Sequence, residues 1–130
     1  MEFIETADAP APGGHYSQAV VANGFIFVAG QLPIARDGSV MPADAAGQMR
    51  LAFANAEAIL AAAGAGLGDI VSATVYVRDI ALWPEINRAY ATILGDHRPA
   101  RTVAVSPQLH YDALVEVQLV AVERSQKSVR

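Results

Sequence analysis

The order of helical and extended segments constrains the fold of this chain more than any other feature of the sequence. Ala43–Ala63 follows the helical period, because apolar side chains recur at steps of three and four, at Met49, Phe53, Ala56, Leu60 and Ala63. The strand expected at Ile70–Arg78 alternates between two faces, and a second helix is expected from Pro84 to about Leu94. Helices between strands imply right-handed crossovers, which predicts a sheet with both helices on one face.

The N-terminal third of the sequence predicts further strands. Met1–Thr6 is interpreted as a short edge strand. Ser17–Ala22 and Phe25–Gly30 are predicted to form a hairpin closed by Asn23-Gly24, which is a strong signal for a two-residue turn.

Two more strands are expected near the C-terminal end, and each contains a charged residue in an apolar run. Arg101 begins Arg101–Val105, Glu116 interrupts Ala113–Val120, and only Pro107–Asp112 separates the two, as in a hairpin. A buried charge costs several kcal/mol unless it is paired or hydrogen-bonded. Anion recognition by the arginine and proton handling by the glutamate are therefore predicted.

The composition predicts one domain that associates with other copies of itself. The chain has 130 residues, of which residues 1–124 are expected to form the domain and Ser125–Arg130 a polar tail. Hydrophobic residues make up 53% of the chain and charged residues only 17%. If both helices cover one face of the sheet, the other face is bare and largely apolar, which predicts oligomerisation.

Several classes of site are excluded or disfavoured by composition. The absence of cysteine excludes disulfides, thiol nucleophiles and zinc–thiolate sites. The net charge of −4 and the scattered basic residues argue against a nucleic-acid surface. Glu57 and Asp69 interrupt the alanine-rich stretch Leu51–Ile70, so no membrane span is expected. The N-terminus lacks the pattern of a signal peptide, and the cytoplasm is the expected compartment.

Four short segments, in the same order along the chain, resemble elements of the RidA/YjgF family of reactive intermediate and imine deaminases. Gly14–Ala19 is similar to the family's G-P-Y-S-Q-A, and Val28–Pro33 to its S-G-Q-I/L-P. Pro99–Thr102 is similar to P-A-R-S/T, and Ala113–Val117 resembles the final strand with its glutamate.

The resemblance implies an α+β fold like that of Bacillus chorismate mutase, with a six-stranded mixed sheet and two helices packed on one face. It also implies a homotrimer whose substrate sites lie in the clefts between subunits. In such a fold the strand Ile70–Arg78 is inserted between the last two strands, which replaces the hairpin suggested by their local spacing.

The resemblance assigns catalytic roles to two residues. Arg101 would hold the carboxylate of a 2-imino acid through its planar guanidinium, and Glu116 would orient the attacking water or relay protons. The alternatives are an arginine that caps a loop or pairs with a surface acid, and a glutamate that is paired structurally across a subunit interface.

Four further residues are candidates for substrate binding. By resemblance, Tyr16 of the neighbouring subunit forms an aromatic wall, Asn87 lies near the cleft, and the backbone of Gly30 and Val103 lines the pocket. Simple packing is the alternative for Tyr16, and a solvated helix face is the alternative for Asn87.

The sequence also departs from the family pattern. Ala29 and Val103 stand where the best-studied members have serine and cysteine, and Gln118 replaces a frequent glutamate. His97 and His110 have no spacing typical of a metal site, so they are assigned to surface or loop-packing roles.

The function implied by the resemblance is hydrolytic deamination of reactive 2-imino or enamine acids to 2-keto acids and ammonia. No cofactor and no metal are expected, because a protonated imine is already electrophilic. One alternative is a non-catalytic regulatory trimer that binds small carboxylates. Another is an endoribonuclease or translation inhibitor, which the acidic charge disfavours.

Overall fold

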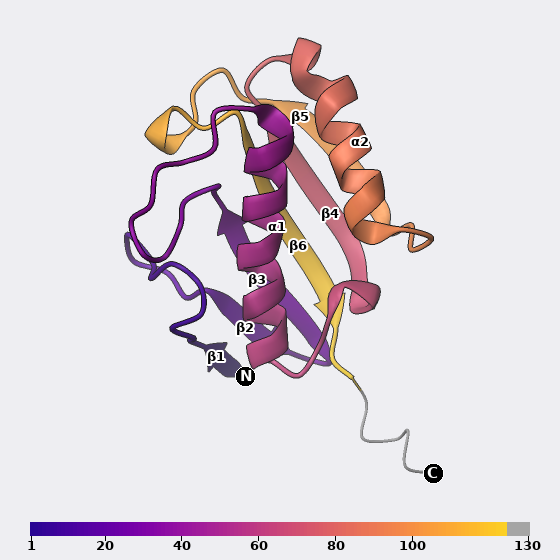
Figure 1. The fold of residues 1–130 in the computed structure, drawn as a ribbon. Helices are drawn as coiled ribbons and strands as arrows, with labels where there is room; N and C mark the ends of the chain where they lie inside the picture. Colours follow the sequence, from indigo (N-terminus) through magenta and orange to yellow (C-terminus); the bar gives the residue numbers. More distant parts are fainter. Residues whose placement is uncertain (125–130) are drawn as a thin grey trace.

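The computed structural model describes residues 1–124, so the predicted tail at 125–130 lies outside the described residues. The chain forms one mixed sheet with two long helices on one of its faces (Figure 1). The strands are β1 (Glu2–Ile4), β2 (Ala19–Ala22), β3 (Phe25–Gln31), β4 (Ile70–Val77), β5 (Ala100–Val105) and β6 (Val115–Val122). The helices are α1 (Ala45–Ala62) and α2 (Trp83–Leu94), with short 3-10 turns at Leu67–Asp69, Ile80–Leu82 and His110–Asp112.

The order of the strands across the sheet is β1-β2-β3-β6-β4-β5. β4 pairs with β5 in parallel, whereas β4 and β6, like the remaining neighbours, are antiparallel. The insertion of β4 between the last two strands is confirmed, and the local hairpin pattern of those two strands was misleading. β5 is left as an edge strand, so one side of its backbone has no strand partner among residues 1–124.

Local sequence signals explain most of the boundaries. The hairpin turn at Asn23 and Gly24 has φ values of 52° and 82°, the left-handed conformation that this type of tight turn requires. α1 begins at Ala45 rather than Ala43, because the Asp44 carboxylate caps the helix and accepts from the Gly47 N–H at 3.1 Å. β6 begins at Val115 rather than Ala113.

The late start of β6 has a local cause. The Leu114 N–H donates to Gln48 Oε1 at 2.7 Å instead of entering the strand ladder. Gln48 belongs to α1 and is itself buried, with its amide donating to the Pro42 carbonyl at 2.8 Å. A buried polar side chain thus ties the helix to the loop before β6.

The core lies between the two helices and one face of the sheet. Its largest buried side chains include Phe53, Met49, Ile26 and Leu119. On β4 the predicted inward residues Ala73, Val75 and Val77 are buried, as the alternating pattern indicated. Their neighbours in the sequence point to the opposite face.

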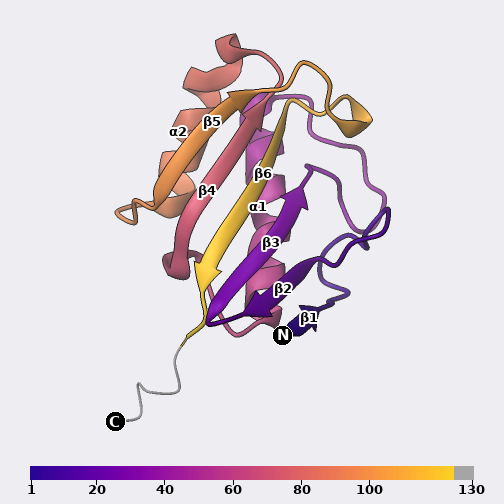
Figure 2. The same cartoon turned by 180° about the vertical axis from the view of Figure 1, so that it is seen from behind.

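Within residues 1–124, that opposite face carries no helix, as the view from behind shows (Figure 2). On β3, Phe25 and Phe27 expose 42% and 48% of their surface there, and their rings lie 6.3 Å apart. The bare apolar face expected from the sequence is therefore present in the described residues, and the structure shows that part of it is aromatic.

Candidate functional site

Arg101 lies at the start of the edge strand β5 and reaches toward α2. In the parallel register it stands opposite Ala73, whose side chain is buried beneath the helices, so Arg101 faces the helical layer. Its guanidinium donates to Asn87 Oδ1 at 2.9 Å. The same group stacks over the Trp83 ring at 4.7 Å and the Tyr90 ring at 4.9 Å. Arg101 is exposed, yet its orientation is set by three side chains of one helix.

This constellation borders a shallow pocket of about 380 Å³, lined in part by Asn87, Tyr90, Leu94 and Arg101. The Tyr90 hydroxyl is buried and has no hydrogen-bond partner within residues 1–124. Burial raises the pKa of Tyr90, and the positive charge of Arg101 opposes that rise. Arg101 has no carboxylate partner among the ion pairs of the described residues, so its donors remain available to an anion.

Sequence reasoning found Arg101 and Asn87 but missed the two aromatic rings that hold the arginine. The sequence does contain a signal for these rings. On α2, Asn87 follows Trp83 by four residues and Tyr90 follows Asn87 by three, so the three side chains share one helix face. Val103 stands on the same side of β5 as Arg101, opposite Val75, and is half-buried against the core.

Glu116 occupies the opposite face of the sheet. It stands across from Tyr76 in the β4–β6 register, while its neighbours Val115 and Val117 point into the core. Its carboxyl group lies directly over Gly30 of β3, where a Cβ atom would collide with Glu116 Oε2. Burial raises the pKa of Glu116 above its ordinary value of 4.5, and the nearby His110 opposes the rise.

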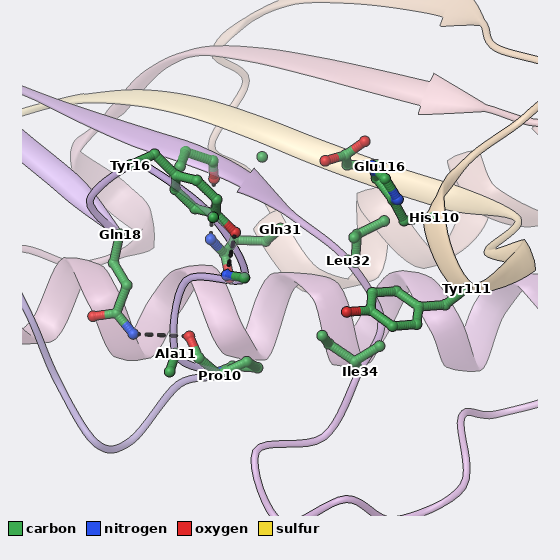
Figure 3. A pocket seen from close by; sticks show the side chains of 14 residues that line it. Pro10, Ala11, Tyr16, Gln18, Gln31, Leu32, Ile34, His110, Tyr111 and Glu116 are labelled. Carbon is green, nitrogen blue, oxygen red and sulfur yellow. Dashed lines mark hydrogen bonds between the residues drawn. The ribbon is translucent and has the colours of Figure 1, made fainter.

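Glu116 opens into a pocket of about 460 Å³ that is lined by the N-terminal loop, β3 and the turn before β6 (Figure 3). Tyr16 forms one wall, and its hydroxyl accepts the Gly13 N–H at 3.2 Å. The loop that carries Tyr16 is held by Gln18, which is buried and donates to the Pro10 carbonyl at 2.9 Å. The predicted residues Tyr16, Gly30 and Glu116 are thus brought together.

His110 and Tyr111 also line this pocket. The sequence analysis assigned His110 to a loop, and it does lie in the turn His110–Asp112, but its ring is beside the Glu116 carboxyl group (Figure 3). His110 and Glu116 also line a second, adjoining pocket of about 480 Å³. No sequence motif indicated this placement, because the position of His110 depends on an unusual turn.

The candidate residues therefore form two half-sites on opposite faces of one chain. The first half-site contains Arg101 and Asn87, and the second contains Tyr16, Gly30 and Glu116. The sequence analysis grouped Arg101 with Glu116 and assigned only Tyr16 to a neighbouring subunit. The structure instead groups Tyr16 with Glu116, and one chain does not bring Arg101 and Glu116 together.

Residues 1–124 contain neither a metal-binding cluster nor a membrane-spanning helix. No cluster of three or more histidine, aspartate or glutamate side chains is arranged to hold a metal ion. Neither of the long helices in that part of the chain has the length and apolarity needed to cross a membrane.

Fold and candidate site together define an α+β protein with an oriented arginine and a partly buried carboxyl group. The family model described as Endoribonuclease L-PSP matches residues 6–123. The chain belongs to this family, which confirms the resemblance to RidA/YjgF proteins.

Relatives and solved structures support the assignment over almost the whole chain. A RutC family protein of Pyrococcus horikoshii is 40% identical over 92% of this chain and 96% of its own length. The 2-iminobutanoate/2-iminopropanoate deaminase of Escherichia coli K12 is 36% identical over 93% and 97%. The crystal structure of E. coli TdcF with bound serine has a TM-score of 0.90 at 34% identity, covering 96% of this chain and 100% of TdcF.

Proposed function

We propose that this protein hydrolyses reactive 2-imino or enamine acids to 2-keto acids and ammonia in clefts between the subunits of a homotrimer. The observation that carries the proposal is the guanidinium of Arg101, held by Asn87 and two aromatic rings beside an open pocket and without a carboxylate partner in the described residues. Relatives named as imine deaminases support the reaction class. The expected compartment is the cytoplasm.

The division of candidate residues between two faces supports a shared site. In a trimer, the Arg101 half-site of one subunit would meet the Glu116 half-site of the next, and the aromatic face around Phe27 would be covered. Each cleft would then contain a carboxylate-binding side chain and a proton-accepting side chain from different chains. The backbone of Gly30 and Val103 would line the same cleft.

The chemistry then needs only these groups and water. Arg101 binds the substrate carboxylate through two parallel hydrogen bonds. Glu116 accepts a proton as water forms a C–O bond to the protonated imine carbon, and the C=N electron pair moves to nitrogen. Glu116 returns that proton to the amino nitrogen. The Glu116 carboxylate then takes the proton of the carbinol hydroxyl, the C=O bond forms, and the C–N bond breaks to release ammonia. Ammonia takes up the proton from Glu116, which restores the carboxylate.

The direct test generates the imine with an amino-acid dehydratase or oxidase and traps what survives with semicarbazide. Arg101→Lys keeps the charge but loses the planar fork and both ring stacks. Losing these contacts costs about 2–4 kcal/mol, which corresponds to about a 30- to 1,000-fold fall in kcat/KM. The control is Arg88→Lys, which changes an exposed arginine of α2 and should act like the wild type. An unchanged imine lifetime with wild-type protein would disprove the proposed activity.

A second candidate function is a regulatory trimer that binds small carboxylates without turnover. It is favoured by Ala29 and Val103, which replace the family's serine and cysteine, and by the small molecule bound to TdcF. Calorimetry with 2-ketobutyrate beside the rate assay separates binding from turnover. An endoribonuclease activity, suggested by the family description, would require RNA cleavage that disappears in Arg101→Ala.

A further inference from the structure

The turn before β6 has a strained backbone in an unusual place. Tyr111 and Asp112 have φ values of 63° and 56°, so two consecutive residues other than glycine adopt the left-handed conformation. This conformation is unfavourable for residues that carry a Cβ atom, and strain of this kind persists only where the surroundings enforce it. Such positions cluster at functional sites.

The surroundings of the turn supply the enforcing contacts. The Arg78 guanidinium donates to the Asp112 carbonyl at 3.1 Å and lies 3.9 Å from its carboxylate. The Ala113 N–H closes the turn onto the His110 carbonyl at 3.2 Å, and Leu114 is tied to Gln48 of α1 at 2.7 Å. The turn is therefore anchored to β4 on one side and to α1 on the other.

The result of this anchoring is the placement of His110. Its ring lies on the boundary between the two pockets that share Glu116, with the Glu116 carboxyl group beside it (Figure 3). The other titratable side chains that line these pockets are the phenols of Tyr16, Tyr76 and Tyr111. His110 is thus the one lining residue in the described chain that can bring a positive charge to Glu116.

Two further charges belong to the surroundings of Glu116. Arg78 directly follows β4, two residues after Tyr76, which stands across from Glu116, but it is engaged by Asp112. The negative charge of Asp112 offsets that of Arg78. Within one chain, the balance at Glu116 depends on burial, which favours the protonated form, and on His110, which favours the carboxylate. In the proposed trimer, Arg101 of the next subunit would add a second positive charge, which acts in the same direction as His110.

We propose that His110 is a positioning residue of the Glu116 half-site, held beside the Glu116 carboxyl group by the strained turn so that it favours the proton-accepting form of Glu116. The catalytic role of His110 rests on the proposed function. The effect of His110 on the titration of Glu116 is a property of the folded chain and can be measured without activity. His110 acts through Glu116 and needs no contact with substrate.

The test has one readout that does not depend on activity. Carboxyl ¹³C NMR of glutamate-labelled protein follows the titration of Glu116, which is assigned by its disappearance in Glu116→Gln. In His110→Gln the Glu116 midpoint should move to higher pH by about half a unit to two units. His110→Lys, which keeps a positive charge, should restore it toward the wild-type value. Arg50→Gln, which removes a charge from the outer side of α1, should leave it unchanged.

The kinetic readout is the pH below which kcat/KM falls. In His110→Gln this pH should rise by the same amount as the Glu116 midpoint measured by NMR. The limiting value of kcat/KM at high pH should stay within about threefold of the wild-type value. A Glu116 titration unaffected by His110→Gln would overturn the inference. If the NMR shift is present but wild-type protein consumes no imine, the proposed function fails and the coupling stands. If His110→Gln does not fold, His110→Asn takes its place, and a Glu116 midpoint equal to that of the wild type overturns the inference.

Discussion

A mixture of two inactive variants should recover activity if Arg101 and Glu116 act from different chains. Arg101→Ala removes the carboxylate-binding group of one half-site, and Glu116→Gln removes the proton acceptor of the other. Because the two residues lie on opposite faces of the sheet, one chain cannot supply both to the same pocket. A trimer that contains both variants can still form a cleft from the intact half-site of each.

The size of the recovery follows from this geometry. In trimers assembled at random from equal amounts of the two variants, each cleft takes Arg101 from one subunit and Glu116 from the next. Half of the subunits carry an intact Arg101 and half carry an intact Glu116, so about a quarter of the clefts are complete. The mixture should therefore show about a quarter of the wild-type rate per cleft, while each variant alone stays inactive.

The assay co-refolds the variants from denaturant and measures imine loss by semicarbazide trapping. A matched control mixes wild type with the double variant Arg101→Ala/Glu116→Gln in equal amounts. Shared clefts predict about a quarter of full activity in both mixtures, whereas a site within one chain predicts none in the first and about half in the control. No recovery in the first mixture, with mixed trimers demonstrated by tagged pull-down, would refute the shared-cleft reasoning.

Four other outcomes are expected. Gly30→Ala places a methyl group against the Glu116 carboxyl, so kcat/KM should fall about 100-fold while circular dichroism shows a folded protein; a rate near wild type would contradict the close approach. Because burial raises the pKa of Glu116 above 4.5, and the carboxylate is the working form, kcat/KM should begin to fall at a higher pH than for an exposed glutamate; a flat profile down to about pH 4.5 would exclude this. Phe27→Glu puts a charge on the bare sheet face and should yield monomers in light scattering, whereas Val40→Glu, in an exposed loop, should not. Gly24→Ala should lower the unfolding free energy by about 1 kcal/mol in urea titrations, because φ is 82° there, and equal stability would argue against the tight turn.

The sequence alone determined the elements and the identity of several candidate residues. The apolar period of α1, the Asn23-Gly24 turn and the alternation of β4 are short-range signals, because each depends on residues a few positions apart. Arg101 and Glu116 stood out for the same reason, as charges within apolar runs. The boundaries differed by about two residues where a side chain from elsewhere, such as Gln48, took over a backbone hydrogen bond.

Tertiary structure decided which of these residues share a pocket. The alternating sequence pattern shows only that neighbouring side chains on a strand point to opposite faces of the sheet. The register of β4 against β5 and β6 places Arg101 on the helical face and Glu116 on the bare face. The rings of Trp83 and Tyr90 reach Arg101 only once α2 packs beside β5. His110 meets Glu116 through a left-handed turn without glycine, a conformation that long-range contacts with Arg78 and Gln48 enforce and that no local pattern encodes.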